Sequence, residues 1–209
     1  MSDLEALKSE ILRYCILSMR YQLNFNTQGN ISVRLPDDRL MITPTDLDYD
    51  LMSPDDMVIT DMDGDIVEGK HEPSSEVTVH AEIYRERPDV QAIVHTEPVF
   101  ANSFGVAGKP IKGALVNMVI YTKGDVPIMP FHLSNSTEFG KLMCAVMGDL
   151  NAVVWANHGL VTVGPDLRTA FKTSVAVESA AKVLVHAAAL TSDPPIVLEY
   201  DKLGITKAL

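Results

Sequence analysis

The sequence predicts an α/β fold in which helices pack on a sheet of mostly antiparallel strands. Short apolar segments occur in pairs joined by turn-forming residues, and segments with helical spacing of apolar side chains, 4–23 and 166–190, lie near the two ends. Paired short strands indicate antiparallel hairpins rather than a repeated βαβ pattern. The two pairs are 31–35 with 39–43 and 57–60 with 65–68.

Further helices and strands are predicted in the rest of the chain. Ser74 and Ser75 are suitable N-caps for a helix that reaches about residue 85. The segment 166–190 is apolar on more than one side, which predicts burial in the core or in a subunit interface. No repeat, low-complexity tract or linker divides the chain, so we expect a single domain over residues 1–209. The other predicted helices are 99–106 and 136–147, and the other predicted strands are 90–95, 118–121, 126–129, 152–155 and 160–163.

Composition limits the partners and the compartment. The chain has 209 residues, of which 46% are hydrophobic, and a net charge of −11. This charge argues against nucleic acid and an anionic membrane as partners, because both bind clustered Lys and Arg. No apolar run approaches the roughly 18 residues that cross a bilayer. An acidic start without a secretory pattern, and Cys15 and Cys144 in apolar segments, predict a cytoplasmic protein with reduced thiols.

Three polar side chains next to apolar runs predict a metal site. His95 and Glu97 close the run 90–97 two positions apart, and residues i and i+2 of a strand project from the same face. His158 follows another apolar run, 153–156. Two imidazoles and one carboxylate suit zinc and neighbouring first-row divalent ions and leave coordination positions open for a substrate. The alternative is that each residue is an isolated polar group at a strand end.

Taken in order, four motifs resemble those of the class II aldolase and adducin family. No single motif is specific, but together they extend over nearly the whole chain. The resemblance implies a three-layer αβα fold with a central mostly antiparallel sheet, a homotetramer with active sites at subunit interfaces, and a catalytic divalent metal, usually zinc. The motifs are Gly29-Asn30-Ile31-Ser32, Ile42-Thr43-Pro44-Thr45, Pro73-Ser74-Ser75-Glu76, and the pair His95-Thr96-Glu97 with Asn157-His158-Gly159.

The resemblance also implies roles for single residues. Glu76 corresponds to the catalytic acid or base, a role for which we expect a pKa raised by a closed, partly dry pocket. Hydroxyls and backbone N–H groups at a helix N-terminus hold a phosphate without lysine. The alternatives are that Ser74 and Ser75 only cap the helix, that Asn30 is a turn residue, and that Glu76 favours the helix dipole. The residues that correspond to the family's phosphate site are Gly29, Asn30, Thr45, Ser74 and Ser75.

Three positions depart from the family pattern. Glu97 replaces the second histidine of a His-x-His motif. If its carboxylate binds the ion, its negative charge makes the ion a weaker Lewis acid, and the preferred metal moves from zinc towards manganese, iron or cobalt. Asp46 stands where the family usually has glycine, and its carboxylate would repel a phosphate unless it points outward. The tyrosine that family aldolases take from a neighbouring subunit aligns with Val116, so Tyr121, a few residues on, is the candidate proton donor.

These features favour a metal-dependent aldolase. Such a lyase cleaves a small ketose phosphate to dihydroxyacetone phosphate and an aldehyde through a metal-stabilised enediolate. A sugar-phosphate epimerase, dehydratase or decarboxylase would use the same fold and a similar site. A non-catalytic, adducin-like interaction domain is the alternative from a different class. The replaced ligand at position 97 favours that alternative, whereas the presence of Glu76, His95 and His158 together argues against it.

Overall fold

Eight strands form one open sheet in the described part of the chain. The structure, a computed structural model, describes residues 3–132 and 136–204. All neighbouring strands are antiparallel except β6 and β7, which are parallel, so the prediction of a mostly antiparallel sheet is confirmed. In order across the sheet the strands are β4 (Ile66–Glu68), β3 (Val58–Asp61), β2 (Arg39–Ile42), β1 (Asn30–Leu35), β5 (Ala92–Thr96), β8 (Gly159–Gly164), β7 (Ala152–Trp155) and β6 (Ile128–Met129).

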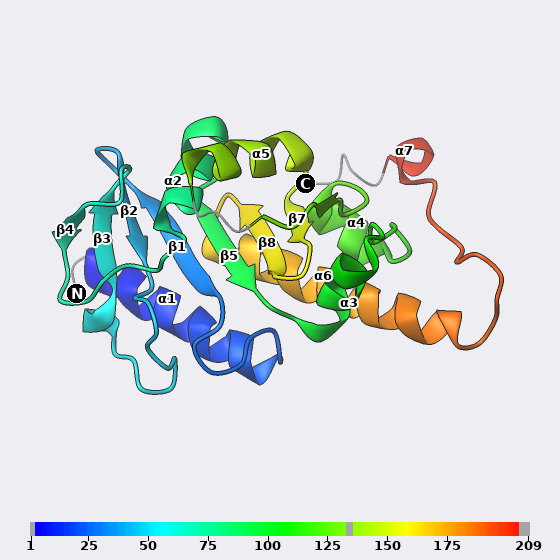
Figure 1. Ribbon diagram of the computed structural model, residues 1–209, viewed down its shortest axis with the longest axis horizontal. Helices are drawn as coiled ribbons and strands as arrows, with labels where there is room; N and C mark the ends of the chain where they lie inside the picture. The colour runs from blue at the N-terminus through cyan, green and yellow to red at the C-terminus, as the bar shows by residue number, and fades with distance from the viewer. Residues whose placement is uncertain (1–2, 133–135, 205–209) are drawn as a thin grey trace.

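Helices cover both faces of this sheet and give the three-layer αβα architecture that the sequence predicts (Figure 1). The side chains of β5 show how one strand serves two cores. Ile93 packs with residues of α2 and α5, whereas its neighbours Ala92 and Val94 pack with residues of α1 and α6 on the opposite face. The covering helices are α2 (Val77–Glu86) and α5 (Thr137–Met147) on one face, and α1 (Asp3–Arg20) and α6 (Leu167–Ala188) on the other.

Shorter helices pack beside α6, and one of them corrects a prediction. Residues 118–121, predicted to be a strand, lie in α4 (Val116–Thr122). Valine, isoleucine and tyrosine favour strands by propensity, but tertiary packing outweighs propensity here: Met118 is buried in a cluster with α6 residues, and α4 packs along α6 as a helix. The remaining helices are α3 (Val99–Ala107), α7 (Tyr200–Leu203) and a single 3-10 turn, Pro54–Asp56.

Two of the element boundaries that differ from the predicted ones have an evident physical reason or consequence. The strand predicted at 126–129 is only the two-residue β6, and Pro127 immediately before it has no N–H to donate to a sheet. The helix predicted to start at Ser74 begins at Val77, with Glu76 at its N-cap. This boundary matters for function, because it places the Glu76 side chain at the point where the chain enters α2.

Both cysteines are free thiols, as predicted: Cys15 is buried and Cys144 is half-buried. Among the described residues, none of the helices is both long enough and apolar enough to span a membrane.

Candidate active site

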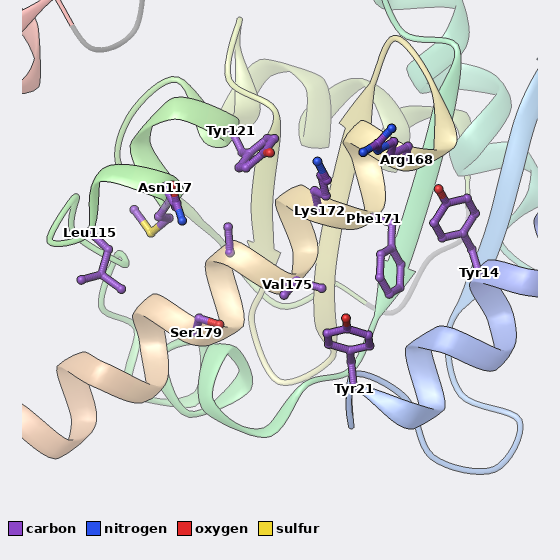
Figure 2. Close-up of a pocket in the computed structure, with 12 residues that line it drawn as sticks. Tyr14, Tyr21, Leu115, Asn117, Tyr121, Arg168, Phe171, Lys172, Val175 and Ser179 are labelled. Atoms are coloured by element: carbon purple, nitrogen blue, oxygen red, sulfur yellow. The ribbon is translucent and has the colours of Figure 1, made fainter. Parts of the chain in front are cut away.

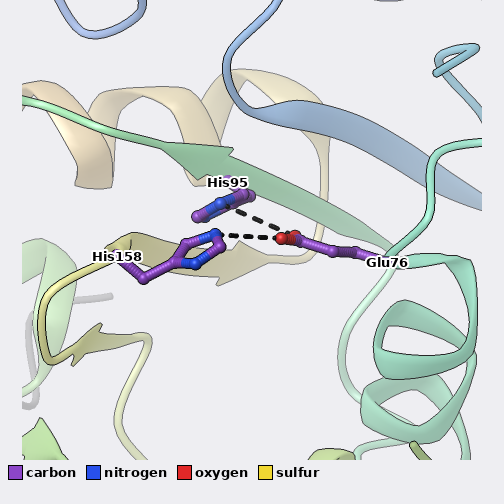
Figure 3. Close-up of side chains that lie close together, drawn as sticks. All are labelled: Glu76, His95 and His158. Carbon is purple, nitrogen blue, oxygen red and sulfur yellow. Dashed lines mark ion pairs between the residues drawn. The ribbon is translucent and has the colours of Figure 1, made fainter. Parts of the chain in front are cut away.

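Glu76, His95 and His158 come together at one end of the sheet (Figure 3). His95 is the second-last residue of β5, and its cross-strand partner on β1 is Asn30. His158 lies in the turn between β7 and β8, after Asn157, whose φ of 59° is in the left-handed region that asparagine tolerates. Glu76 approaches from the start of α2. The group therefore joins three segments that are far apart in the sequence.

The three side chains are close enough to share one ion. His158 Nε2 lies 3.0 Å from one Glu76 carboxylate oxygen, and His95 Nε2 lies 3.6 Å from the other. One ligand atom from each residue lies within 4.8 Å of the other two. His95 and Glu76 are buried, whereas the His158 side chain is 30% exposed. The group is therefore open to solvent on the His158 side.

Neighbouring groups fix both imidazole rings. The backbone carbonyl of Leu160 lies 3.2 Å from His95 Nδ1, so that nitrogen carries the proton in this contact and Nε2 is the ring nitrogen that faces Glu76. The Trp155 ring stacks on His158 with centroids 3.7 Å apart and an angle of 7° between the planes. The amide of Asn102 donates to the His158 carbonyl oxygen at 3.1 Å. Both rings are thus held with Nε2 towards Glu76.

Gly159 permits this close approach. A Cβ at this position would lie 2.5 Å from His95 Cε1 and 2.6 Å from the Thr96 carbonyl oxygen. Either distance is shorter than a non-bonded contact allows, so any other residue would displace the ring or the strand. The His-Gly sequence that follows β7 is therefore a steric requirement of the site.

The imidazoles determine the charge of Glu76. Burial alone would raise the pKa of its carboxyl, but His95, His158 and the Asn30 amide, which donates at 3.0 Å, together hold that pKa well below its usual range. The sequence led us to expect the opposite direction. The reason for the difference is that the carboxylate faces two imidazoles and not an apolar wall.

Glu97 lies outside this group. Strand β5 ends at Thr96, and the Glu97 N–H leaves the sheet ladder to donate to the Leu23 carbonyl oxygen at 3.0 Å and to Asn24 Oδ1 at 2.9 Å. The i, i+2 rule used for positions 95 and 97 therefore stops applying at this residue. Its half-buried side chain lines a shallow open pocket together with Asn102. The role of Glu97 as a metal ligand stays a prediction.

Two of the residues predicted to hold a phosphate contact Glu76. Asn30 donates to its carboxylate, and Ser74 Oγ accepts from its backbone N–H at 3.3 Å. The Thr45 N–H donates to the Glu72 carbonyl oxygen, which places the exposed Thr45 next to the segment that carries Ser74 and Ser75. Their role in phosphate binding stays a prediction.

Two backbone conformations explain positions in these motifs. Gly29 has a φ of 71°, and a Cβ there would lie 2.5 Å from the His95 carbonyl oxygen, so only glycine fits. Asp46 has a φ of 50°, the left-handed region in which glycine carries no penalty, and its side chain is exposed. This conformation is the physical reason why glycine suits position 46.

Tyr121, the predicted proton donor, is not brought to Glu76 within this chain. It lies on α4 and lines a cavity of about 380 Å³ between α1, α4 and α6, and no member of the Glu76, His95 and His158 group lines that cavity (Figure 2). Its catalytic role stays a prediction that requires a second subunit.

A buried network next to the site was missed in the sequence. Ser32 Oγ lies 2.7 Å from His80 Nδ1 and 2.8 Å from the Tyr84 hydroxyl. His80 Nε2 is buried and has no hydrogen-bond partner in the described part of the chain. The available signal was the spacing: His80 follows Glu76 by one helical turn, and Ser32 follows Asn30 on the same strand face.

Comparison with known proteins identifies the family. Residues 9–185 match the class II aldolase and adducin N-terminal domain. The chain belongs to this family. A 5-methylthioribulose-1-phosphate/5-deoxyribulose-1-phosphate aldolase of Rhodospirillum rubrum is 35% identical over 160 residues, which are 77% of this chain and 72% of that protein. A 5-deoxy-D-ribulose 1-phosphate aldolase of Bacillus thuringiensis is 28% identical over 201 residues, 96% of this chain and 93% of that protein.

A solved structure supports the same family assignment. An L-fuculose 1-phosphate aldolase superposes with a TM-score of 0.89 at 27% sequence identity, over 99% of this chain and 96% of that one. The resemblance inferred from the four motifs is therefore confirmed, and the chain is a class II aldolase, a carbon–carbon lyase.

Membership of this family implies a divalent metal ion, and the residues present fit one. Two imidazole nitrogens and a carboxylate are a donor set for first-row divalent ions. His95 Nε2 is buried and lacks a hydrogen-bond partner among the described residues, and an ion at this position would satisfy it. The Leu160 carbonyl oxygen on the opposite ring nitrogen is the outer contact typical of a metal-binding histidine.

Proposed function

We propose that this class II aldolase cleaves a ketose 1-phosphate to dihydroxyacetone phosphate and an aldehyde. The observation that carries the proposal is the group of Glu76, His95 and His158. This group combines a metal-binding donor set with an ionised carboxylate at the N-terminus of α2. The relatives support the substrate class, because their names specify ketose 1-phosphates.

His95, His158 and Glu76 would hold the ion, and Glu97 is a further predicted ligand. When bound, a divalent ion supplies Lewis-acid stabilisation of the negative charge that develops on the substrate oxygens. Zinc is the ion we propose, with manganese, iron or cobalt as the alternatives if the Glu97 carboxylate also binds it.

Glu76 moves the proton at the reacting carbon. In the direction of bond formation its ionised carboxylate accepts the proton from the carbon next to the carbonyl of dihydroxyacetone phosphate. In cleavage the carboxyl delivers a proton to the same carbon after the carbon–carbon bond breaks, and the balance closes because the substrate hydroxyl that becomes the aldehyde carbonyl loses one proton. Asn30 orients the carboxylate by donating to it at 3.0 Å. A protonated Glu76 loses its attraction to the imidazoles, which favours the return of the proton.

Substrate binding involves the segments around Glu76. We propose that Gly29, Asn30, Thr45, Ser74 and Ser75 provide the N–H groups and hydroxyls that hold the phosphate. The N–H groups and hydroxyls allow a dianion to bind without a lysine. The Asp46 carboxylate next to Thr45 is exposed, and among the described residues it forms no hydrogen bond with Ser74 or Ser75.

We further propose a cytoplasmic homotetramer whose active sites are completed by neighbouring subunits. In support, the exposed side chains of Phe25, Val99 and Val106 line the shallow pocket beside Glu97, and apolar side chains gathered at a site are typical of an interface. A second subunit would also be the source of Tyr121. Light scattering should give about four times the chain mass of 22.9 kDa.

The direct test is release of dihydroxyacetone phosphate from 5-deoxyribulose 1-phosphate and L-fuculose 1-phosphate. Glu76→Gln should reduce kcat by a factor on the order of 10²–10⁴, the usual contribution of a general acid or base. Glu72→Gln, which changes an exposed carboxylate four residues earlier, is the matched control and should keep activity. Equal activity of Glu76→Gln and Glu72→Gln would show that Glu76 is not the proton carrier.

A further inference from the structure

The cavity between α1, α4 and α6 is separate from the catalytic group. Its wall residue Phe171 belongs to the core cluster on the α1 and α6 face of the sheet. Trp155, which stacks on His158, belongs to the cluster on the α2 and α5 face. The volume of about 380 Å³ is within the range of small-molecule sites. A ligand here would not touch the proposed metal ligands of the same chain.

Positive charge is concentrated at one side of this cavity. Arg168 and Lys172 lie four residues apart on α6, both exposed, a spacing at which like charges destabilise a helix. In the described part of the chain neither forms a hydrogen bond or ion pair with a carboxylate, although the chain carries a net charge of −11. The contact that Lys172 does make is with the face of the Tyr121 ring, at 5.9 Å.

The acids near this cavity do not pair with either cation in the described residues. Burial raises the pKa of Tyr14 and the carboxylates of Glu10 and Asp166 raise it further, while Asp166 also caps α6 by accepting a hydrogen bond from the Thr169 N–H at 2.6 Å. By contrast, Lys8, Arg85 and Lys112 on other parts of the surface each pair with carboxylates. The two cations at the cavity are thus available to an anion from solution.

The rest of the cavity suits an apolar group. Figure 2 shows Tyr121, Lys172 and Arg168 gathered at one side, with Tyr21 and Ser179 opposite. Apolar side chains, including Phe171, Val175 and Met118, form most of the remaining wall. Tyr14 also lines this cavity, with its ring 5.1 Å from that of Phe171, and its hydroxyl has no hydrogen-bond partner among the described residues.

We propose that this cavity binds a small organic anion, with its phosphate or carboxylate group between Arg168 and Lys172 and an aromatic ring or short alkyl chain against Phe171 and Val175. Guanidinium and ammonium groups form charge-assisted hydrogen bonds with such anions, and the tyrosine hydroxyls add uncharged donors. Within one chain this second site is separate from the catalytic group, because none of its charged residues contacts Glu76, His95 or His158. Tyr121 at its edge is also the residue that we propose to complete the active site of a neighbouring subunit.

Calorimetric titration with phenyl phosphate tests the site, with inorganic phosphate and phenol as partial probes. Phenyl phosphate should bind about tenfold or more tightly than either partial probe, because only it engages both the cations and the apolar wall. Lys172→Gln should weaken it about tenfold or more, since a hydrogen bond to a charged group is lost. Lys182→Gln is the matched control, because it removes one charge from another exposed lysine of α6 that also lies over a ring, that of Phe100.

The possible results separate this site from the alternatives. Equal weakening by Lys172→Gln and Lys182→Gln would show a non-specific charge effect and overturn the proposal. Weakening by Ser74→Ala but not by Lys172→Gln would place the probe at the proposed catalytic phosphate site instead. A change of molar mass in Lys172→Gln, without any phenyl phosphate binding to the wild type, would show that a second copy of the chain covers the cavity. Val175→Phe, which narrows the apolar part without a charge change, should weaken phenyl phosphate more than inorganic phosphate.

Discussion

Replacing His80 by glutamine should change how stability depends on pH. His80 is buried on α2, its Nδ1 lies 2.7 Å from Ser32 Oγ, and its Nε2 has no partner among the described residues. Burial lowers the pKa of His80 to about 4, compared with 6.5 for an unperturbed histidine. A protonated imidazole in this position would be a buried cation without a hydrogen-bond acceptor at Nε2.

The sign and size of the effect follow from these two pKa values. Above about pH 6.5 the imidazole is neutral in the folded and unfolded chains, so its full contribution to stability is present. Between pH 6.5 and 4 the unfolded chain binds a proton that the folded chain does not, and stability falls as the pH falls. The difference between the two pKa values corresponds to about 3 kcal/mol, reached near pH 4.

Urea unfolding of metal-free protein between pH 7.5 and 4.5, followed by Trp155 fluorescence, measures this contribution. His80→Gln should have a lower free energy of unfolding than the wild type at pH 7.5. This difference in free energy should narrow by about 2–3 kcal/mol at pH 4.5, because only the unfolded wild-type chain gains a proton at position 80. Ser32→Ala, which keeps the imidazole, is the control and should retain the wild-type slope. Parallel curves for the wild type and His80→Gln would refute the reasoning.

Three further substitutions test the packing of the site and of the fold. Gly159→Ala should weaken binding of zinc at least about tenfold, measured by chelator competition, because the added Cβ displaces His95; unchanged affinity would contradict the steric argument. Glu97→His should shift metal preference from manganese towards zinc, in the same assay, and an unchanged preference would show that position 97 stays outside the coordination shell. Arg87→Ala should lower the free energy of unfolding by about 2–4 kcal/mol, because Arg87 pairs with Asp89 and donates to the carbonyl oxygens of Gly148 and Leu150; a loss below about 0.5 kcal/mol would contradict this.

The fold could be predicted from the sequence where periodicity and burial agree. The apolar run around Ile93 marks a strand with two buried faces, and the turn at residues 61–64 marks a hairpin. The prediction failed at 118–121, where strand-forming side chains pack against α6 as a helix. That outcome depends on a contact between segments far apart in the chain, and local propensity carries no information about it.

The candidate site was predictable in its residues more than in its geometry. His95 and His158 were assigned to one site from their positions beside apolar runs, and the structure brings them together. The spacing of residues along the chain could not show that Glu76 joins them or that the N–H of Glu97 turns towards Asn24. The first feature depends on where the N-terminus of α2 packs, and the second on which segment lies beside the end of β5. Both are contacts between distant segments, which local sequence does not determine.

The metal content of the purified protein tests the central claim most directly. The account predicts about one equivalent of a first-row divalent metal per wild-type chain, measured by mass spectrometry of the elements, and almost none in His158→Ala. His71→Ala, a histidine paired with Asp56 away from the group, should keep the wild-type content. A wild-type chain without metal, or equal content in the His158→Ala and His71→Ala proteins, would contradict the account.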